Sequence, residues 1–418
     1  MKHIFKQAFA ASSGTFLQWY DFSLFGYFAP LLAELFFPAQ APTAALLYTF
    51  AAFAVSYLLA PVGAFFFGYI GDNWGRKKAL TLSILAMALP TALIAVLPSY
   101  QTAGLLAALL LTFFRIMQGL VASAEYAGSA LFLVEHAPAH RKCFYGSLTS
   151  SAYSLGSTLA AGVAALATWP GMPPWAWRLP FALALVAGVL IFYMRRNLAE
   201  TPDFNRANHV QRERTNFLTA LRKHPRSVAC TLLVALFIGI LTFGTYVYAP
   251  TYLHLYSKLP LSTAIGFTTL ALLLDAALEP WFALLADRLG AKLVSMLGCW
   301  GVILLAYPLF QLLSSGSAVN ALLGMLCLST LIALTCAPLN AILVSLFPPD
   351  CRFSGFAVSF NLSIALSAAM PLFMTGCLTA TGNLLAPAAF YIVGGFAALL
   401  GLLLAKASKF RLHVLAPA

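Results

Sequence analysis

Twelve stretches of mostly apolar residues, separated by short polar segments, dominate this sequence. A helix needs about 20 such residues to cross the hydrocarbon core of a membrane, and each stretch is close to that length or longer. The stretches cover approximately residues 12–37, 44–70, 79–98, 102–134, 143–168, 177–195, 225–255, 262–287, 291–313, 318–347, 353–380 and 384–406. The sequence therefore predicts an all-α membrane protein with twelve transmembrane helices.

The composition agrees with a membrane location. Apolar residues account for 61% of the 418 positions, and charged residues for only 9%. A soluble domain carries roughly 25% charged residues, so this chain has too little charge to cover a surface that faces water. We conclude that lipid is its main solvent.

The basic residues lie almost entirely on one side of the predicted helices. Of the 24 Lys and Arg, Arg115 falls within an apolar stretch and Arg178 and Lys258 fall in loops on one side, which leaves 24 − 3 = 21 on the opposite side. Cytoplasmic loops carry such an excess, and an even number of helices places both termini together. We therefore expect a protein of the bacterial inner membrane with both termini in the cytoplasm. The net charge of +12 then serves contacts with anionic lipid and not with nucleic acid.

A charged segment that follows the second helix recurs after the eighth. Asp72-Asn73-Trp74-Gly75-Arg76-Lys77 and Asp287-Arg288-Leu289-Gly290-Ala291-Lys292 are 287 − 72 = 215 residues apart. Pro138-x-x-Arg141 and Pro349-x-x-Arg352, after the fourth and tenth helices, are 352 − 141 = 211 residues apart. Two similar offsets indicate a duplicated six-helix unit, and parallel halves of this kind place a substrate site between them near the midplane of the membrane.

A polar, Arg-rich stretch separates the two halves. We expect an N-terminal six-helix bundle at 1–195, a cytoplasmic linker at 196–224, a C-terminal six-helix bundle at 225–406 and a cytoplasmic tail at 407–418. The linker is either a set of short amphipathic helices on the inner leaflet or a disordered segment.

Five segments carry a family resemblance. They are Gly71-Asp72-x-x-Gly75-Arg76-Lys77 after the second helix, Gly14-Thr15-Phe16-Leu17-Gln18-Trp19-Tyr20-Asp21-Phe22 in the first, Arg115-Ile116-Met117-Gln118-Gly119 and Ala124-Glu125-Tyr126-Ala127-Gly128 in the fourth, and Trp177-Arg178-Leu179-Pro180-Phe181 in the sixth. The first resembles the loop motif of the major facilitator superfamily. The others together resemble its metabolite:proton symporter branch, which includes proline/betaine, α-ketoglutarate, citrate and shikimate transporters. The resemblance implies a 6+6 pseudo-twofold fold that works by alternating access, and we expect a monomer.

The chain departs from that family pattern at several positions. Gln18 stands where the family usually has Glu, Ser123 and Ala124 replace two Gly, and Ala291 stands where Arg is common. The change at Gln18 removes a titratable group, which keeps schemes other than proton symport open.

The resemblance also implies a gate on the inner side. Asp72 would cap and pair with a neighbouring helix to hold the outward-open state, and Arg76 would contact carbonyls of the eleventh helix or acidic groups. The full set of predicted gating residues is Asp72, Gly75, Arg76, Lys77, Glu135, Arg141, Asp287 and Arg352. The alternative is that these charges only set topology.

Ionisable side chains inside the predicted helices are functional candidates, because a buried charge is costly unless it is paired. Asp21 and Glu125 each lie nine residues from the inner ends of their apolar stretches, which predicts a similar depth. Arg115 lies ten residues from Glu125, so about 15 Å nearer the outside, and needs another partner. We expect Asp21 and Glu125 to couple proton movement to transport, and Arg115 to bind a substrate carboxylate or gate a carboxyl group. The alternative is a fixed structural network of ion pairs.

The eighth helix carries a second acidic pair. Asp275 lies near its middle and Glu279 follows at i+4, so both carboxyl groups share one helix face. We expect them to face the cavity and to take part in proton coupling; the alternative is pairing with helix ends or nearby polar groups. One Arg set against four acidic groups favours a zwitterion, or a monoanion that travels with protons, over a tricarboxylate.

Aromatic and polar residues complete the expected substrate site. Trp19 and Tyr20 flank Asp21 and offer aromatic faces to a quaternary amine. The predicted substrate contacts are Gln18, Trp19, Tyr20, Arg115, Tyr126, Tyr246 and Trp281.

Together these features favour a proton-coupled symporter that imports a small polar metabolite, with protons, the substrate and membrane lipid as its partners. The chain has no Gly-rich ATP loop and no metal-binding motif, so we expect neither an enzyme nor a cofactor. Two other functions stay open. One is an exporter or uniporter of a small organic acid or a larger carboxylate conjugate, and the other is a membrane receptor that binds its ligand without moving it.

Overall fold

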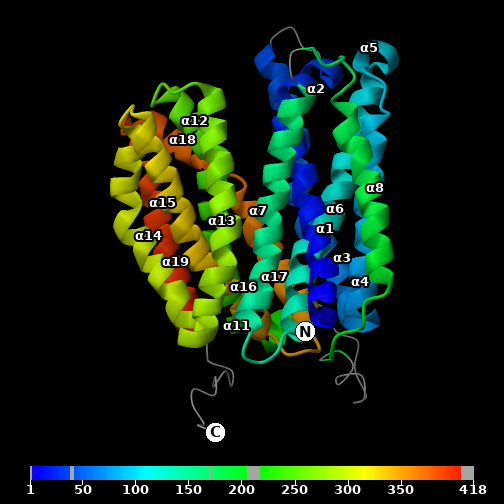
Figure 1. Ribbon diagram of the computed structural model, residues 1–418, viewed down its shortest axis with the longest axis vertical. Coiled ribbons are helices and arrows are strands. Elements are labelled where there is room, and N and C mark those ends of the chain that lie inside the picture. Colours follow the sequence, from blue (N-terminus) through cyan, green and yellow to red (C-terminus); the bar gives the residue numbers. More distant parts are fainter. Residues whose placement is uncertain (1, 38–41, 169–170, 203, 205–216, 406–418) are drawn as a thin grey trace.

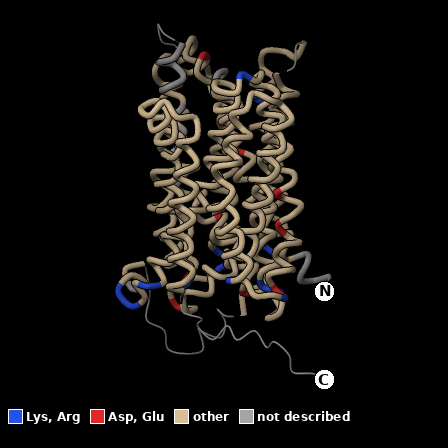
Figure 2. The backbone as a smooth tube through the Cα atoms, turned by 90° about the vertical axis from the view of Figure 1, so that its left-hand side faces the viewer, with Lys and Arg blue, Asp and Glu red and all other residues tan. Residues whose placement is uncertain are grey.

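The computed structural model describes residues 2–37, 42–168, 171–202, 204 and 217–405, and all regular secondary structure in these residues is helical. The helices form two bundles that stand side by side (Figure 1). We call the end of the molecule at which α1 begins and α19 ends the base. Lys and Arg gather mainly at the base, and most of the chain above it consists of residues other than Lys, Arg, Asp and Glu (Figure 2).

The first bundle contains the helices α1 to α8. Their bounds are α1 Lys2–Tyr27, α2 Ala29–Phe36, α3 Pro42–Trp74, α4 Arg76–Ala95, α5 Tyr100–Ala103, α6 Leu105–His136, α7 Lys142–Ala167 and α8 Arg178–Arg196. The first predicted stretch is divided into α1 and α2. With α3, α4, α6, α7 and α8, it accounts for six passes.

The second bundle follows the short helix α10. Its bounds are α10 Phe217–Lys223, α11 Pro225–Thr242, the π-helix η1 Phe243–Tyr248, α12 Ala249–Leu255, α13 Leu261–Leu289, α14 Ala291–Ser314, α15 Ala318–Cys336, α16 Leu339–Ser345, α17 Arg352–Ser367, α18 Met370–Thr381 and α19 Pro387–Leu404. The continuous units α11–η1–α12, α15–α16 and α17–α18 each make one pass, so this bundle also has six.

Ten of the twelve passes are long and apolar enough to be recognised as membrane spans by length and composition alone. The other two are α1 and α7, which carry more polar residues. Their polar side chains, such as Ser154 and Asp21, lie in the interior of the protein and not against lipid. The structure thus confirms the expected all-α fold of twelve helices. The predicted linker 196–224 lies partly outside the described residues, and the predicted tail 407–418 lies wholly outside them.

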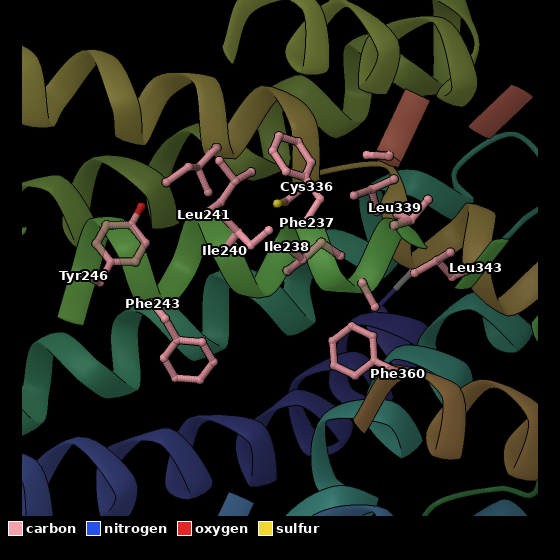
Figure 3. Close-up of a cluster of buried hydrophobic side chains, with 14 of the residues drawn as sticks. Phe237, Ile238, Ile240, Leu241, Phe243, Tyr246, Cys336, Leu339, Leu343 and Phe360 are labelled. Carbon is pink, nitrogen blue, oxygen red and sulfur yellow. The ribbon is translucent and has the colours of Figure 1, made fainter. Parts of the chain in front are cut away.

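The two bundles meet along α7 and α13 on one side and along α3 and α17 on the other. The second bundle presents a buried apolar cluster to this interface, made by α11 and η1 together with α15, α16 and α17 (Figure 3). Phe243 of η1 extends from this cluster towards the first bundle, whereas the hydroxyl of Tyr246 lies 3.2 Å from Ser329 Oγ of α15 within the second bundle. Pro250 has no N–H to donate to Tyr246, which accounts for the local change from an α- to a π-helix. The π-turn therefore sets the direction of two aromatic rings at the centre of the molecule.

Candidate functional site

A cavity lies between the two bundles, with about 830 Å³ of space not filled by atoms, part of it open to solvent. The first bundle lines it with residues of α1, α3, α6 and α7, and the second with residues of α11, η1, α13, α15 and α17. The lining residues are Gln18, Trp19, Phe22, Ser56, Tyr57, Ala60, Ala122, Tyr126, Ser150, Tyr153, Ile238, Thr242, Phe243, Tyr246, Asp275, Glu279, Ile332, Cys336, Phe360, Asn361, Ile364 and Ala365. This position, at the interface of two repeated halves, is the one expected for a substrate site.

Aromatic rings form much of the cavity wall. Trp19 packs edge-on against Tyr153, with ring centroids 4.4 Å apart. Two ring pairs cross between the bundles: Tyr57 lies edge-on to Phe243 at 5.5 Å, and Tyr126 stacks on Phe360 at 5.0 Å. The rings therefore link the two halves around the cavity.

The charged residues of the lining are both acidic. Asp275 is 1% exposed and Glu279 is 2% exposed, and they lie one turn apart on α13. Ser154 donates a hydrogen bond to Asp275 Oδ2 at 2.7 Å. Among the described residues, Asp275 Oδ1 and Glu279 Oε2 have no hydrogen-bond partner, and neither carboxyl group forms an ion pair. The described part of the cavity lining thus contains two buried carboxyl groups and no basic side chain beside them.

The structure places six of the sequence-predicted residues on the cavity wall: Gln18, Trp19, Tyr126, Tyr246, Asp275 and Glu279. It contradicts the prediction for Trp281, whose side chain is 71% exposed on the outer face of α13. Two residues after Glu279, a helix has turned by about 200°, so the two side chains point in nearly opposite directions. The prediction for Tyr20 is also wrong, because its hydroxyl donates to Pro180 O at 3.1 Å, within the first bundle.

Arg115 lies behind the cavity wall and pairs with Asp21, with 3.5 Å between Nη1 and Oδ2. Both side chains are fully buried. Gln118 joins them, since its Oε1 accepts from Arg115 at 2.8 Å and its Nε2 donates to Asp21 at 3.1 Å. The guanidinium lies 4.7 Å from the ring centroid of Phe22, which lines the cavity. A single aromatic ring therefore separates this ion pair from the cavity.

Glu125 does not line the cavity, and it has a partner that the sequence interpretation missed. Arg195 of α8 binds both carboxylate oxygens, with distances of 2.9 and 2.8 Å. Ser83 donates a third hydrogen bond at 2.6 Å. Arg195 had been counted among the basic residues outside the helices, yet it is fully buried.

The prediction that Asp21 and Glu125 lie at similar depth is wrong. Thr15 donates to the backbone oxygen of Glu125 at 3.3 Å, so Glu125 lies beside Thr15, six residues before Asp21. Six residues of helix span about 9 Å. The estimate failed because α1 begins at Lys2 and not near residue 12, where the apolar stretch begins. The two carboxyl groups therefore belong to separate sites.

At the base, the loop motif connects the two bundles. Asp72 accepts hydrogen bonds from the backbone N–H groups of Phe353 and Ser354, at 2.9 and 2.8 Å, and so caps the start of α17. Arg76 lies 3.3 Å from Asp72 and donates to Pro349 O at 2.8 Å across the interface. These contacts hold the bundles together at this end.

A carboxylate of α6 extends this network. Glu135 forms ion pairs with Arg76 at 3.4 Å and with Arg352 of the second bundle at 2.9 Å. Between this network and the cavity, the buried Asn340 of α16 donates to Gly146 O at 3.0 Å and to Ser150 Oγ at 3.1 Å. The sequence interpretation missed Asn340. We call the contacts made by Asp72, Arg76, Glu135, Asn340 and Arg352 the base network.

The second half repeats only part of this arrangement. Asp287 accepts from the N–H groups of Cys143 and Phe144, at 2.9 and 3.0 Å, and so caps α7 of the first bundle. Adding the repeat offsets to Arg76 and Glu135 gives Ala291 and Leu346, which carry no charge. Arg141, the counterpart of Arg352, consequently has no acidic partner among the described residues and is exposed. The expected place of Arg141 in the charge network is therefore contradicted.

Gly75 and Lys77 serve the loop motif through their backbone. Gly75 has φ = +112°, and a Cβ there would lie 2.2 Å from Glu200 Oε2. The Glu200 carboxylate accepts from the N–H groups of Arg76 at 3.0 Å and Lys77 at 3.2 Å, which caps the start of α4. Glu200 was not predicted, because a lone acidic residue after a helix gives no signal of the helix start that it caps.

Comparison with known proteins agrees with this geometry. Residues 11–370 match the family model of the Major Facilitator Superfamily. The chain is 33% identical to a "Putative proline/betaine transporter" of Staphylococcus haemolyticus, over 92% of this chain and 83% of that protein. It is 30% identical to the "Proline/betaine transporter" of Escherichia coli, over 92% and 80%.

Solved structures show the same fold. The proton:xylose symporter XylE bound to 6-bromo-6-deoxy-D-glucose superposes with a TM-score of 0.79, covering 96% of this chain and 95% of that one at 18% sequence identity. The inward open conformation of XylE from E. coli gives a TM-score of 0.66, again at 18% identity.

Proposed function

The chain belongs to the Major Facilitator Superfamily and is a multi-pass membrane transporter, and on this basis we propose that it imports a small zwitterion together with protons. The names of its relatives favour a substrate of the proline or betaine type. The cavity supports this choice, because its aromatic wall suits a methylated or ring-closed ammonium group.

The observation that carries the proposal is the buried pair Asp21–Arg115 behind Phe22. When Asp21 takes up a proton, it loses the charge that attracts Arg115, and the guanidinium turns towards its remaining partner Gln118. Phe22 contacts this guanidinium on one side and the cavity on the other, so the change reaches the substrate. Proton uptake and substrate binding are thereby linked through one ring.

The base network supplies the gate in this scheme. Alternating access requires the base to open towards the cytoplasm, which breaks the contacts of Asp72, Glu135 and Arg352 across the interface. We place the protein in the bacterial inner membrane as a monomer with cytoplasmic termini, which puts the base on the cytoplasmic side. Glu125 has a structural part here and holds α8 against α6 through Arg195.

The test is uptake of labelled glycine betaine or proline into proteoliposomes with an alkaline interior. Asp21→Asn cannot release a proton, so we expect pH-driven uptake to fall at least about tenfold, the effect of roughly 1.4 kcal/mol. Exchange of substrate between the two sides should persist. Glu34→Gln, at an exposed acidic position of α2 away from the cavity, is the matched control.

Other results would assign a different function. Equilibration that ignores the pH gradient would indicate a uniporter, and binding without flux would indicate a receptor. Normal pH-driven uptake by Asp21→Asn would refute the assignment of proton coupling to this residue.

A further inference from the structure

We propose that the cavity recognises its substrate by the ammonium group, held at Asp275 and Glu279, and that it therefore binds organic monocations without a carboxylate about as well as zwitterions. This inference rests on the proposed function only because it uses the same cavity. It assigns binding of the ammonium group to the wall formed by α13, and contact with the rest of the substrate to the opposite wall formed by α1.

The first step concerns charge. Within the described part of the chain, the cavity lining contains two carboxyl groups and no Lys or Arg. Arg115 and Arg195 are fully buried in the first bundle, but they lie outside the lining and pair with Asp21 and Glu125. An uncompensated buried carboxylate is unfavourable, so a cation in the cavity would supply the charge that the protein does not.

The second step concerns the chemistry of that cation. Asp275 Oδ1 and Glu279 Oε2 are buried and have no hydrogen-bond partner among the described residues. The aromatic rings of Tyr246 and Tyr126 also line the cavity, and one face of Tyr126 stacks on Phe360, which lines it as well. A quaternary ammonium group has no N–H to donate, and it binds through aromatic faces and nearby negative charge. The lining offers both on the side of α13.

The third step concerns the opposite wall. Gln18 is 7% exposed, and its Oε1 has no hydrogen-bond partner among the described residues; the same holds for the buried Nε1 of Trp19. Gln18 Oε1 accepts, so it suits a hydroxyl and not a carboxylate, whereas Trp19 Nε1–H can donate one hydrogen bond to either group. One hydrogen bond to a carboxylate contributes about 1.5–3 kcal/mol, but the described lining holds no Lys or Arg, so the cost of taking the carboxylate out of water offsets this gain. The carboxylate of a zwitterion should therefore add little to its affinity.

The experiment measures binding to the purified full-length protein in detergent by isothermal titration and by thermal shift. The probes are choline chloride, glycine betaine, sodium chloride and 3,3-dimethyl-1-butanol, which has the shape of choline with an uncharged carbon in place of nitrogen. We expect choline to bind within about threefold of betaine, and the uncharged analogue at least about tenfold more weakly, a difference of 1.4 kcal/mol. A ligand that binds the folded state also raises the melting temperature.

Variants locate the site. Asp275→Asn and Glu279→Gln should each weaken choline and betaine binding about tenfold, whereas Glu34→Gln should bind as the unmodified chain does. The ligand series on the unmodified chain remains decisive if a variant fails to fold.

Three results would overturn the proposal. They are equal affinity for choline and its uncharged analogue, binding of betaine without choline, and stabilisation by sodium chloride equal to that by choline chloride, which would indicate an inorganic cation. Because binding needs no gradient, these results are read separately from the uptake assay. Absence of uptake with intact choline binding would refute the proposed symport and leave this inference standing.

Discussion

At the scale of single residues, the buried pair of Glu125 and Arg195 yields a prediction about stability. Glu125→Gln leaves the guanidinium of Arg195 in the protein interior without its counter-charge, although Ala10 O and Ala11 O still accept from it at 3.1 and 2.8 Å. Removing one partner of a buried ion pair costs about 3–5 kcal/mol. We expect a clear fall in melting temperature, measured by fluorescence-detected unfolding in detergent.

The same measurement separates the two acidic residues of the first bundle. Asp21→Asn should change stability less than Glu125→Gln, because Asp21 has one long ion pair of 3.5 Å whereas Glu125 has two contacts below 3.0 Å with its Arg. An unchanged melting temperature for Glu125→Gln, together with loss of pH-driven uptake, would return Glu125 to a coupling role.

These two pairs also show what the sequence can reveal at this scale. Asp21 and Arg115 interrupt apolar stretches, where any charge is noticeable. Arg195 stands beside Arg196 at the end of such a stretch, where basic residues ordinarily mark topology. Its burial depends on carbonyl groups of α1 and α4 that only the packed structure brings to it. A charge at a helix end therefore carries no sign of its partner.

At the scale of helices, two glycines of α7 make a matched pair. A Cβ at Gly156 would lie 2.3 Å from the backbone oxygen of Phe16 on α1, whereas a Cβ at Gly162 would meet nothing within 4 Å. Gly156→Ala must push the two helices apart, an overpacking that costs typically 1–3 kcal/mol. Gly162→Ala should leave the stability of the protein unchanged or raise it by up to about 1 kcal/mol, because Ala favours the helix more than Gly does.

The check is thermal unfolding of both variants together with uptake at saturating substrate. We expect Gly156→Ala to melt earlier and to transport more slowly, and Gly162→Ala to match the unmodified chain. If the two variants have the same melting temperature and uptake rate, α1 and α7 can move apart at Gly156 with little loss of stability.

The sequence predicted the helices better than their ends and faces. The number of passes followed from twelve apolar stretches, since lipid sets their length. The start of α1 did not, because its first turns are polar and lie ahead of the apolar stretch. Trp281 was assigned to the cavity from residue type alone. Its angular distance from Glu279 on α13 would have excluded it, and helical periodicity is thus a better guide here than aromatic character.

At the scale of the whole molecule, the sequence predicted the repeat of two halves. It did not predict that the two halves make different contacts at the base, because those contacts are known only from the structure. Asp72 and Asp287 cap the fifth helix of the opposite half in the same way. Among the described residues, Asp72 forms an ion pair with a guanidinium and Asp287 does not, since Ala291 stands at the position that corresponds to Arg76. The two halves therefore contribute unequally to holding the base closed.

This asymmetry predicts that Asp72→Asn opens the base more than Asp287→Asn does. Each variant replaces one accepting carboxylate oxygen with an NH2 group and so loses one hydrogen bond from a backbone N–H to a charged acceptor, which contributes about 1.5–3 kcal/mol. Asp72→Asn also removes the ion pair with Arg76. Two native cysteines report the opening: Cys143 is 5% exposed beside Asp287, and Cys351 is 0% exposed beside the start of α17.

Each variant is best read at the cysteine beside the other motif, so that local loosening does not count as opening. Asp72→Asn should raise the rate of maleimide labelling at Cys143 about tenfold, which corresponds to 1.4 kcal/mol, and Asp287→Asn should raise labelling at Cys351 by less, with each site resolved by mass spectrometry. Labelling confined to the cysteine next to the substitution would indicate a frayed helix end. Such a result would separate the loop motif from the movement of the two bundles, because a rigid opening of the base must expose both cysteines together.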